Sequence, residues 1–202
     1  MGESENRIGS PGRGFEVRII SGEFRSRRLE FPKSKRTRPM MDRAKEMIFN
    51  ILGNTVPGAK VLDLFAGSGS LGLEALSRGA NEVIFVEKGP WAVKTIRSNL
   101  EKLNLRGKAL VLPQDVFRAL NRFEKEGRTF NLIFLDPPYN QGVVKKILNR
   151  LGRSDIVTPL TQLILHRSRQ EKLPETLERL EVLREKRFGQ ACLSFLSGRN
   201  KE

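Results

Sequence analysis

Residues 61–72 of this 202-residue chain read VLDLFAGSGSLG. The apolar residues at the start are typical of a buried strand, the glycines of a tight loop, and the apolar pattern that follows of a helix. Peptide N–H groups are free at the start of a helix, and glycine lets a ligand lie against the backbone. The stretch therefore predicts a strand, a ligand-binding loop and the N-terminus of a helix.

Strand and helix patterns alternate from this stretch onward. The expected strands lie near residues 60–64, 82–86, 108–112, 130–135 and 162–165, and the expected helices near 70–78, 90–104, 116–126 and 141–151. The strands are nearly continuous apolar runs, which is typical of strands covered on both faces. Residues 180–187 and 191–196 flank Gly189 as the two arms of a hairpin would. The pattern predicts an α/β protein with a mostly parallel sheet and a C-terminal antiparallel hairpin.

The front of the chain has a different pattern. Residues 1–14 lack periodicity and are rich in glycine and proline toward their end, which is typical of a flexible tail. Two short strands are expected within 15–21 and 27–31, followed by a helix from Met41 to Gly53. We therefore divide the chain into a tail at 1–14, a basic hairpin and helix at 15–57, and an α/β domain at 58–202.

The charge of the chain indicates its partner. Lys and Arg number 37 against 23 Asp and Glu, which gives a formal net charge of +14, and an excess of this size favours nucleic acid. Basic residues beside Phe24 and Phe31 suit a surface that holds phosphates while bases stack nearby, and a solvated loop is the alternative. The residues expected to bind RNA are Arg25, Arg27, Arg28, Lys33, Lys35, Arg36, Arg38 and Arg43.

Several classes of protein are excluded by composition. One cysteine, Cys192, and one histidine, His166, are too few for an internal disulfide or a Cys/His metal site. No apolar run approaches the roughly 18 residues of a membrane helix, and the first residues lack the apolar block of a signal peptide. We expect a cytoplasmic monomer without metal or membrane contact. His166 ends a predicted strand and could face the cleft, but we favour a position at the surface or in the packing.

Acidic residues lie at or near the ends of the first four strands of the predicted sheet: Asp63, Glu87, Asp115 and Asp136. The carboxyl ends of parallel strands meet at one edge, where such proteins bind ligands. Each acid alone could instead cap the helix that follows it. The glycines match the pattern of dinucleotide-binding loops, but an acid before that loop would repel a pyrophosphate.

S-adenosylmethionine fits this edge better than a dinucleotide. Asp63 and the loop amides would receive its methionine end, and Glu87 would accept hydrogen bonds from both ribose hydroxyls. Asp115 and the N–H of Val116 would bind the adenine ring. The residues expected to bind this cofactor are Asp63, Phe65, Gly67, Gly69, Glu87, Lys88, Asp115 and Val116.

The segment Asp136-Pro137-Pro138-Tyr139 follows a predicted buried strand directly. Two prolines fix the backbone and remove two N–H donors, which leaves a carboxylate and a carbonyl at the cleft. Asp136 and the Pro137 carbonyl could accept both N–H bonds of an exocyclic amine while Tyr139 stacks on the base, and the amine would then face a sulfonium methyl for in-line attack. A plain turn is the alternative. Cys192 lies in the predicted last strand, which disfavours thiolate-assisted methylation of a ring carbon and favours an amine target.

Four segments of the chain, at residues 18–22, 38–43, 63–80 and 136–139, resemble the RsmD family of bacterial guanine-N2 methyltransferases of small-subunit ribosomal RNA. The resemblance extends over about residues 17–197. It implies a seven-stranded class I methyltransferase sheet of the Rossmann-like kind, an N-terminal extension that helps bind RNA, and catalysis at residues 136–139. The implied function is methyl transfer to a guanine N2 amine of ribosomal RNA or of the small subunit. The alternatives are a DNA adenine-N6 methyltransferase and a non-catalytic RNA-binding protein on a methyltransferase fold.

Overall fold

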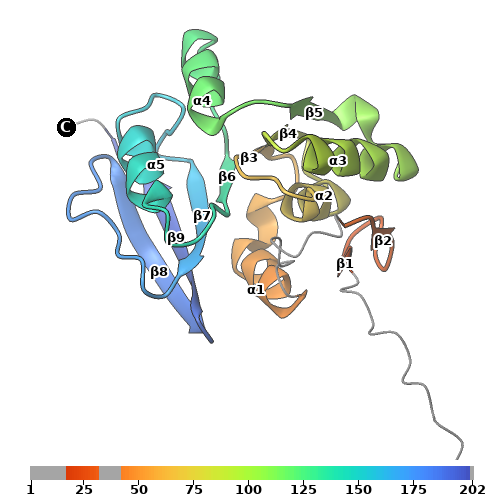
Figure 1. Ribbon diagram of the computed structural model, residues 1–202, viewed down its shortest axis with the longest axis horizontal. Helices are drawn as coiled ribbons and strands as arrows, with labels where there is room; N and C mark the ends of the chain where they lie inside the picture. The colour runs from red at the N-terminus through yellow and green to blue at the C-terminus, as the bar shows by residue number, and fades with distance from the viewer. Residues whose placement is uncertain (1–16, 32–41, 201–202) are drawn as a thin grey trace, which may run out of the picture.

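A sheet of seven strands organises the structure, a computed structural model that describes residues 17–31 and 42–200 (Figure 1). Its strands, in the order β5-β4-β3-β6-β7-β9-β8, are β5 Ala109–Leu112, β4 Glu82–Val86, β3 Lys60–Asp63, β6 Leu132–Leu135, β7 Gln162–Ser168, β9 Ala191–Gly198 and β8 Leu180–Phe188. Strands β3 to β7 are parallel to one another, whereas β9 runs antiparallel between β7 and β8. The predicted sheet and its C-terminal hairpin are confirmed.

Helices cover both faces of the sheet. They are α1 Asp42–Leu52, α2 Ser70–Ser77, α3 Pro90–Lys102, α4 Val116–Lys125 and α5 Val143–Gly152, with short 3-10 turns at Gly53–Thr55 and Arg106–Lys108. Successive strand residues point to opposite faces, so Val61 packs with α1, α2 and α3 while Leu62 packs with α4 and α5. Burial on both sides explains why the strands are continuously apolar.

Helix α2 packs closely on the sheet. A Cβ atom added to Gly72 would lie 2.3 Å from the ring of Phe85 on β4, so any larger residue there would push the helix away. The close packing sets the position of the glycine loop that precedes α2. None of the helices within residues 17–31 and 42–200 is long and apolar enough to cross a membrane.

The N-terminal strands are shorter than predicted. Strands β1 Val17–Arg18 and β2 Arg28–Leu29 form an antiparallel pair of two residues each, whereas we expected strands within 15–21 and 27–31. The backbone leaves β1 because the N–H groups of Ile20 and Ser21 donate to Glu74 of α2, at 2.7 and 3.0 Å, rather than to a neighbouring strand. A contact with a distant helix therefore replaces strand pairing that local pattern favoured.

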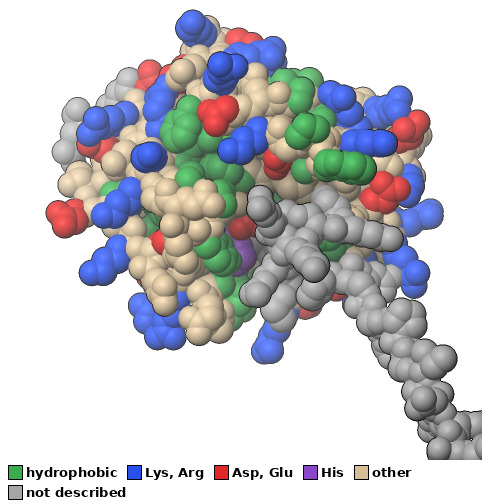
Figure 2. All heavy atoms as spheres, in the orientation of Figure 1, with side chains coloured by type: hydrophobic (Ala, Val, Ile, Leu, Met, Phe, Trp, Pro, Cys, Tyr) green, Lys and Arg blue, Asp and Glu red, His purple; other side chains and the backbone are tan. Residues whose placement is uncertain are grey.

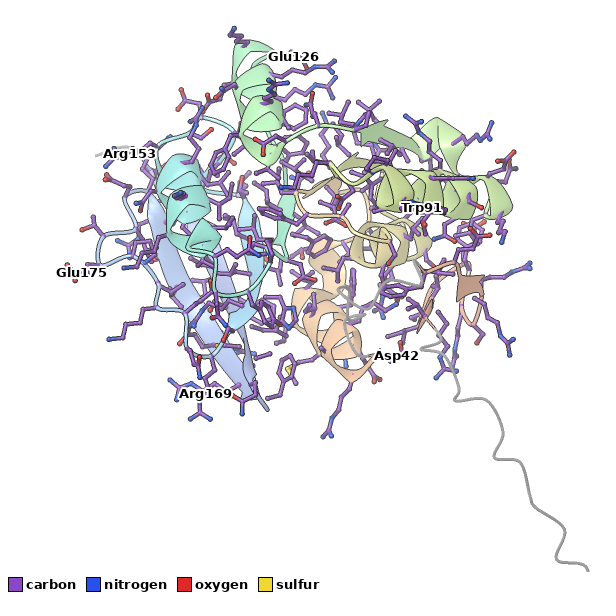
Figure 3. The ribbon with its side chains drawn as sticks, viewed as in Figure 1. Asp42, Trp91, Glu126, Arg153, Arg169 and Glu175 are labelled. Atoms are coloured by element: carbon purple, nitrogen blue, oxygen red, sulfur yellow. The ribbon has the colours of Figure 1, made fainter. Side chains whose placement is uncertain are left out.

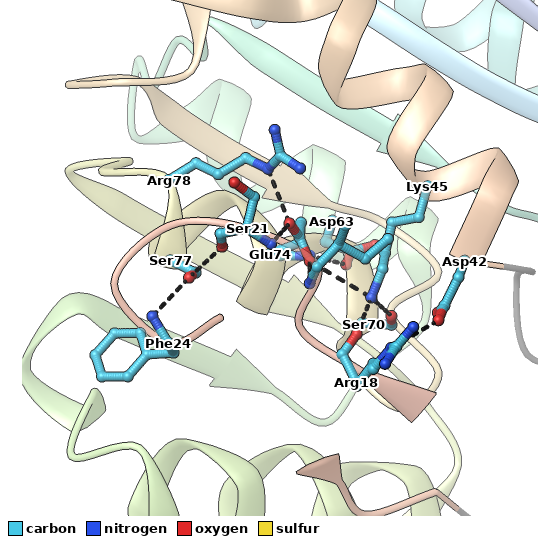
Figure 4. A network of polar contacts seen from close by, with 12 residues as sticks. Arg18, Ser21, Phe24, Asp42, Lys45, Asp63, Ser70, Glu74, Ser77 and Arg78 are labelled. Atoms are coloured by element: carbon cyan, nitrogen blue, oxygen red, sulfur yellow. Dashed lines mark hydrogen bonds and ion pairs between the residues drawn. The ribbon is translucent and has the colours of Figure 1, made fainter. Parts of the chain in front are cut away.

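A buried polar network joins this segment to α1 and α2 (Figure 4). Glu74 is fully buried and also accepts from Arg78 Nε at 2.8 Å, and its Oε2 lies 3.5 Å from Nζ of the fully buried Lys45. Lys45 Nζ also donates to the Arg18 carbonyl and to Ser70 Oγ, the latter at 3.2 Å. Because Ser70 begins α2, the network connects the N-terminal segment to the end of the glycine loop.

Candidate active site

Three of the predicted acids lie at the carboxyl ends of adjacent strands. Asp63 is the last residue of β3, Glu87 follows β4 and Asp136 follows β6, and β3 lies between β4 and β6 in the sheet. Burial is the main cause of the raised pKa of Asp63, and the carboxylates of Asp136 and Glu87 are close enough to add to it. The prediction that these acids lie at one edge of the sheet is confirmed, whereas the ligand groups assigned to them stay predictions.

Asp63 is the most deeply buried of these acids, with 2% of its surface exposed. Its Oδ2 accepts from the N–H of Gly72 at 3.2 Å. Burial, with the help of Asp136 and Glu87 and against the Gly72 hydrogen bond, raises the pKa of Asp63 to about 8. A carboxylate that is costly to ionise in this place would be stabilised by a cationic group of a ligand.

Glu87 has a structural role that the sequence analysis missed. Its Oε2 accepts from the N–H of Gly67 at 2.9 Å and its Oε1 from the N–H of Gly89 at 2.7 Å. Gly67 and Gly69 have φ of 54° and 80°, so the loop takes a course that glycine permits without strain. Each carboxylate oxygen has two lone pairs, so Glu87 can hold this loop and still accept hydrogen bonds from hydroxyls.

Asp115 caps the helix that follows it, and helix capping was one of the two interpretations of this acid, beside ligand binding. Its Oδ1 accepts from the N–H of Phe117 at 2.9 Å, at the start of α4. The second oxygen remains available at the same sheet edge. The nearby predicted contacts differ in exposure: Val116 is buried, Phe65 is half-buried against the α4 and α5 side of the core, and Lys88 is exposed.

The segment 136–139 follows β6 as predicted. Pro137 is buried, Pro138 is exposed, and Tyr139 has 40% of its surface exposed. The side chain of Asp136 is one-third exposed. The segment therefore presents a partly accessible carboxylate and an accessible aromatic ring, as binding of a planar amine requires.

His166 is packed, with 12% of its side chain exposed, and it also faces the candidate site, which was the less favoured interpretation of the sequence. Its Nδ1 lies 2.8 Å from Oδ1 of Asp136 and its Nε2 lies 2.9 Å from the hydroxyl of Tyr139, so it belongs to the candidate site. The register of the sheet explains this contact. Strands β6 and β7 pair Leu135 with Leu165, and the residues that come next in the chain are Asp136 and His166. The contact between Asp136 and His166 could be predicted only with knowledge of the strand order in the sheet, in which β7 lies beside β6.

The predicted RNA-binding residues fall into two groups. Arg25, Arg27, Arg28 and Arg43 are exposed. Lys33, Lys35, Arg36 and Arg38 lie outside the described residues. Figure 2 shows Lys and Arg side chains distributed over the whole visible face rather than gathered at one point. Within residues 17–31 and 42–200, His, Cys, Asp and Glu side chains form no group of three or more that could hold a metal ion.

Comparisons with known proteins identify the same family as the sequence motifs. The model of a family described as conserved hypothetical protein 95 matches residues 17–197. The Bacillus subtilis protein YlbH is 39% identical over 173 residues, which are 86% of this chain and 94% of that protein. Ribosomal RNA small subunit methyltransferase D of Escherichia coli K12 is 33% identical over 88% of this chain and 87% of its own.

A solved structure has the same fold. The Escherichia coli protein yhhF superposes with a TM-score of 0.79 at 30% identity, over 93% of this chain and 100% of that chain. The family model and both relatives extend over most of the chain. This chain is therefore a member of the conserved hypothetical protein 95 family, which is the RsmD family that its sequence motifs resemble.

Proposed function

We propose that this protein transfers a methyl group from S-adenosylmethionine to the exocyclic N2 amine of a guanine in small-subunit ribosomal RNA. A relative with 33% identity is named ribosomal RNA small subunit methyltransferase D, and the Bacillus subtilis relative is named a putative rRNA methyltransferase. The observation that carries the proposal is the position of Asp136, a partly exposed carboxylate one strand away from the buried Asp63. Such an enzyme acts where ribosomal RNA is made, in the cytoplasm.

The residues of the sheet edge fit the cofactor. The buried Asp63 suits the ammonium group of the methionine moiety, because a cation would offset the cost of ionising that carboxyl. Helix α2 begins after Gly69, which supplies no capping side chain, so the N–H groups of its first two residues, before that of Gly72, could receive the methionine carboxylate. Glu87 and Asp115 each retain lone pairs for the ribose and the adenine.

The proposed methyl transfer depends on how residues 136–139 orient the target amine. When bound, the cofactor supplies a methyl group on a positively charged sulfur. Asp136 and the Pro137 carbonyl would accept the two N–H bonds of the guanine amine and so orient its lone pair, while Tyr139 would stack on the base. Positioning and electrostatics would therefore provide most of the rate.

Methyl transfer to purified small subunits, bare ribosomal RNA and duplex DNA, followed by nucleoside analysis, tests the proposal. We expect N2-methylguanosine in an RNA substrate. Methyladenosine as the only product would support a DNA or RNA adenine methyltransferase instead. Absence of S-adenosylmethionine binding in calorimetry would support a non-catalytic RNA-binding protein.

Binding of the cofactor is expected to release a proton from Asp63. Below a pH of about 8 this carboxyl is protonated in the free protein, and a bound ammonium group favours its ionised form. Cofactor affinity should therefore rise with pH up to about 8. Calorimetry near pH 6.5 in buffers of different ionisation enthalpy should show release of about one proton per bound cofactor. Asp63→Asn should remove that release, and equal heats for the wild-type protein in all buffers would contradict the assignment.

The basic N-terminal segment is expected to contribute to RNA binding through phosphate contacts. Replacing Arg27, Arg28, Lys35 and Arg36 with Ala should weaken binding and reduce the salt dependence of the association constant by roughly 0.7 to 0.9 per lost contact. The measurement is RNA affinity across a salt series. A matched control replaces four basic residues at or near the amino ends of the strands, Lys60, Arg106, Lys108 and Lys125, all exposed. Equal salt slopes for the two variants would identify the segment as a solvated loop.

A further inference from the structure

His166 is the only histidine of the chain, and it lies in the middle of the candidate site. It extends from β7 beside β6, and 12% of its side chain is exposed. Its ring stacks on Phe188 at the end of β8, with 6.1 Å between ring centroids and 10° between ring planes. Two strands and the segment after β6 therefore fix the position of the imidazole.

Both ring nitrogens of His166 have partners in segment 136–139. Nδ1 lies 2.8 Å from Oδ1 of Asp136, and Nε2 lies 2.9 Å from the Tyr139 hydroxyl, which is also 3.3 Å from Nδ1. The rings of Tyr139 and His166 meet edge to face, with centroids 5.5 Å apart. One side chain thus contacts the carboxylate and the aromatic ring that the proposed reaction requires.

The chemistry of the partners determines the roles of the two nitrogens. A carboxylate oxygen accepts hydrogen bonds, so Nδ1 carries a proton and donates to Oδ1 of Asp136. The Tyr139 hydroxyl lies within hydrogen-bond distance of Nε2. Burial, and to a lesser extent the carboxylates of Asp136 and Glu171, raise the pKa of Tyr139, so that hydroxyl keeps its proton and can donate.

We infer that His166 is a positioning residue for methyl transfer: it holds Oδ1 of Asp136 so that Oδ2 faces the target amine, and it holds the Tyr139 ring beside that carboxylate. The inference rests on the proposed function. A carboxylate held through one oxygen cannot rotate freely about its side-chain bonds, so its second oxygen has a defined direction before the substrate arrives. Loss of such orientation can cost about 100-fold in rate without loss of cofactor affinity.

Four variants test the inference in single-turnover methyl transfer with N2-methylguanosine as the readout. His166→Asn keeps a donor near the position of Nδ1, His166→Gln keeps a polar group near Nε2, His166→Phe keeps only the ring, and Tyr139→Phe removes only the hydroxyl. We expect the rate constant to fall by about 100-fold in H166F and H166Q and by less than about tenfold in H166N. Y139F should lie between wild type and H166F, and the dissociation constant for S-adenosylmethionine should stay unchanged in all four.

The outcomes separate this inference from the proposed function. A wild-type protein that forms no N2-methylguanosine overturns the proposed function and the inference together. A wild-type protein that forms it, beside an H166F variant of equal rate, overturns the inference alone. If H166F does not fold, as judged by its melting temperature, the comparison of H166N with H166Q decides. Equal rates in those two variants would show that the donor to Asp136 has no special role.

Discussion

Replacing Asp136 with Ala is expected to reduce the rate of methyl transfer by about 10²- to 10³-fold, which is typical when one oriented group that stabilises a transition state is lost. The carboxylate lies at the end of β6 and is the proposed acceptor for an N–H bond of the target amine. Without it the amine has no charged partner to orient its lone pair. Single-turnover transfer from labelled S-adenosylmethionine to the RNA substrate measures the loss.

Cofactor binding separates this role from a structural one. Burial is the main cause of the raised pKa of Asp63, and Asp136 adds to it without a hydrogen bond to Asp63 among the described contacts. S-adenosylmethionine affinity in the Asp136→Ala variant should therefore stay within a few fold of wild type. Glu175→Ala is a matched control, because this exposed acid lies on a loop at the edge of the molecule (Figure 3). Near-normal turnover in Asp136→Ala would contradict the assigned role.

Replacing Glu74 with Ala is expected to lower the free energy of unfolding by about 3 to 5 kcal/mol, the range found when one partner of a buried ion pair is removed. Glu74 and Lys45 are both fully buried, and burial lowers the pKa of Lys45 while Glu74 opposes that shift. The substitution would leave the Lys45 ammonium without its charged partner. It would also leave the N–H groups of Ile20 and Ser21 without their acceptor.

Urea unfolding measures the change, and hydrogen exchange locates it. Exchange should increase in residues 17–31, because this segment is held to α2 through Glu74 and through Ser77, whose Oγ accepts from the Phe24 N–H at 3.0 Å (Figure 4). Glu101→Ala is the control, since Glu101 forms an exposed pair with Arg106 and should cost no more than about 1 kcal/mol. A loss below about 1 kcal/mol for Glu74→Ala would contradict the importance of the network.

Local pattern was sufficient for the architecture. Apolar runs of strand length, separated by amphipathic helices, predicted the parallel strands, and Gly189 between two such runs predicted the hairpin, which has φ of 56° at that glycine. The acids at the strand ends were also predictable as a group. Parallel strands all present their carboxyl ends at one edge, so the end of a strand in the sequence defines a place in the fold.

Contacts between segments that are distant in the sequence were not predictable in this way. His166 meets Asp136 only because β7 pairs with β6 in the register that joins Leu165 to Leu135. Glu87 binds the N–H of Gly67 across twenty residues, and Glu74 binds Ile20 across fifty-four. Each of these pairs depends on the order and register of elements, which no local periodicity contains.

The sequence by itself therefore determined the order of strands and helices along the chain, the membership of the RsmD family and the sheet edge at which the four acids lie. Tertiary structure decided which acids accept hydrogen bonds from backbone N–H groups, which residue contacts Asp136, and where strands β1 and β2 end. The physical reason is that propensity and burial pattern act within a few residues. Hydrogen bonds between buried polar groups depend on which elements pack together.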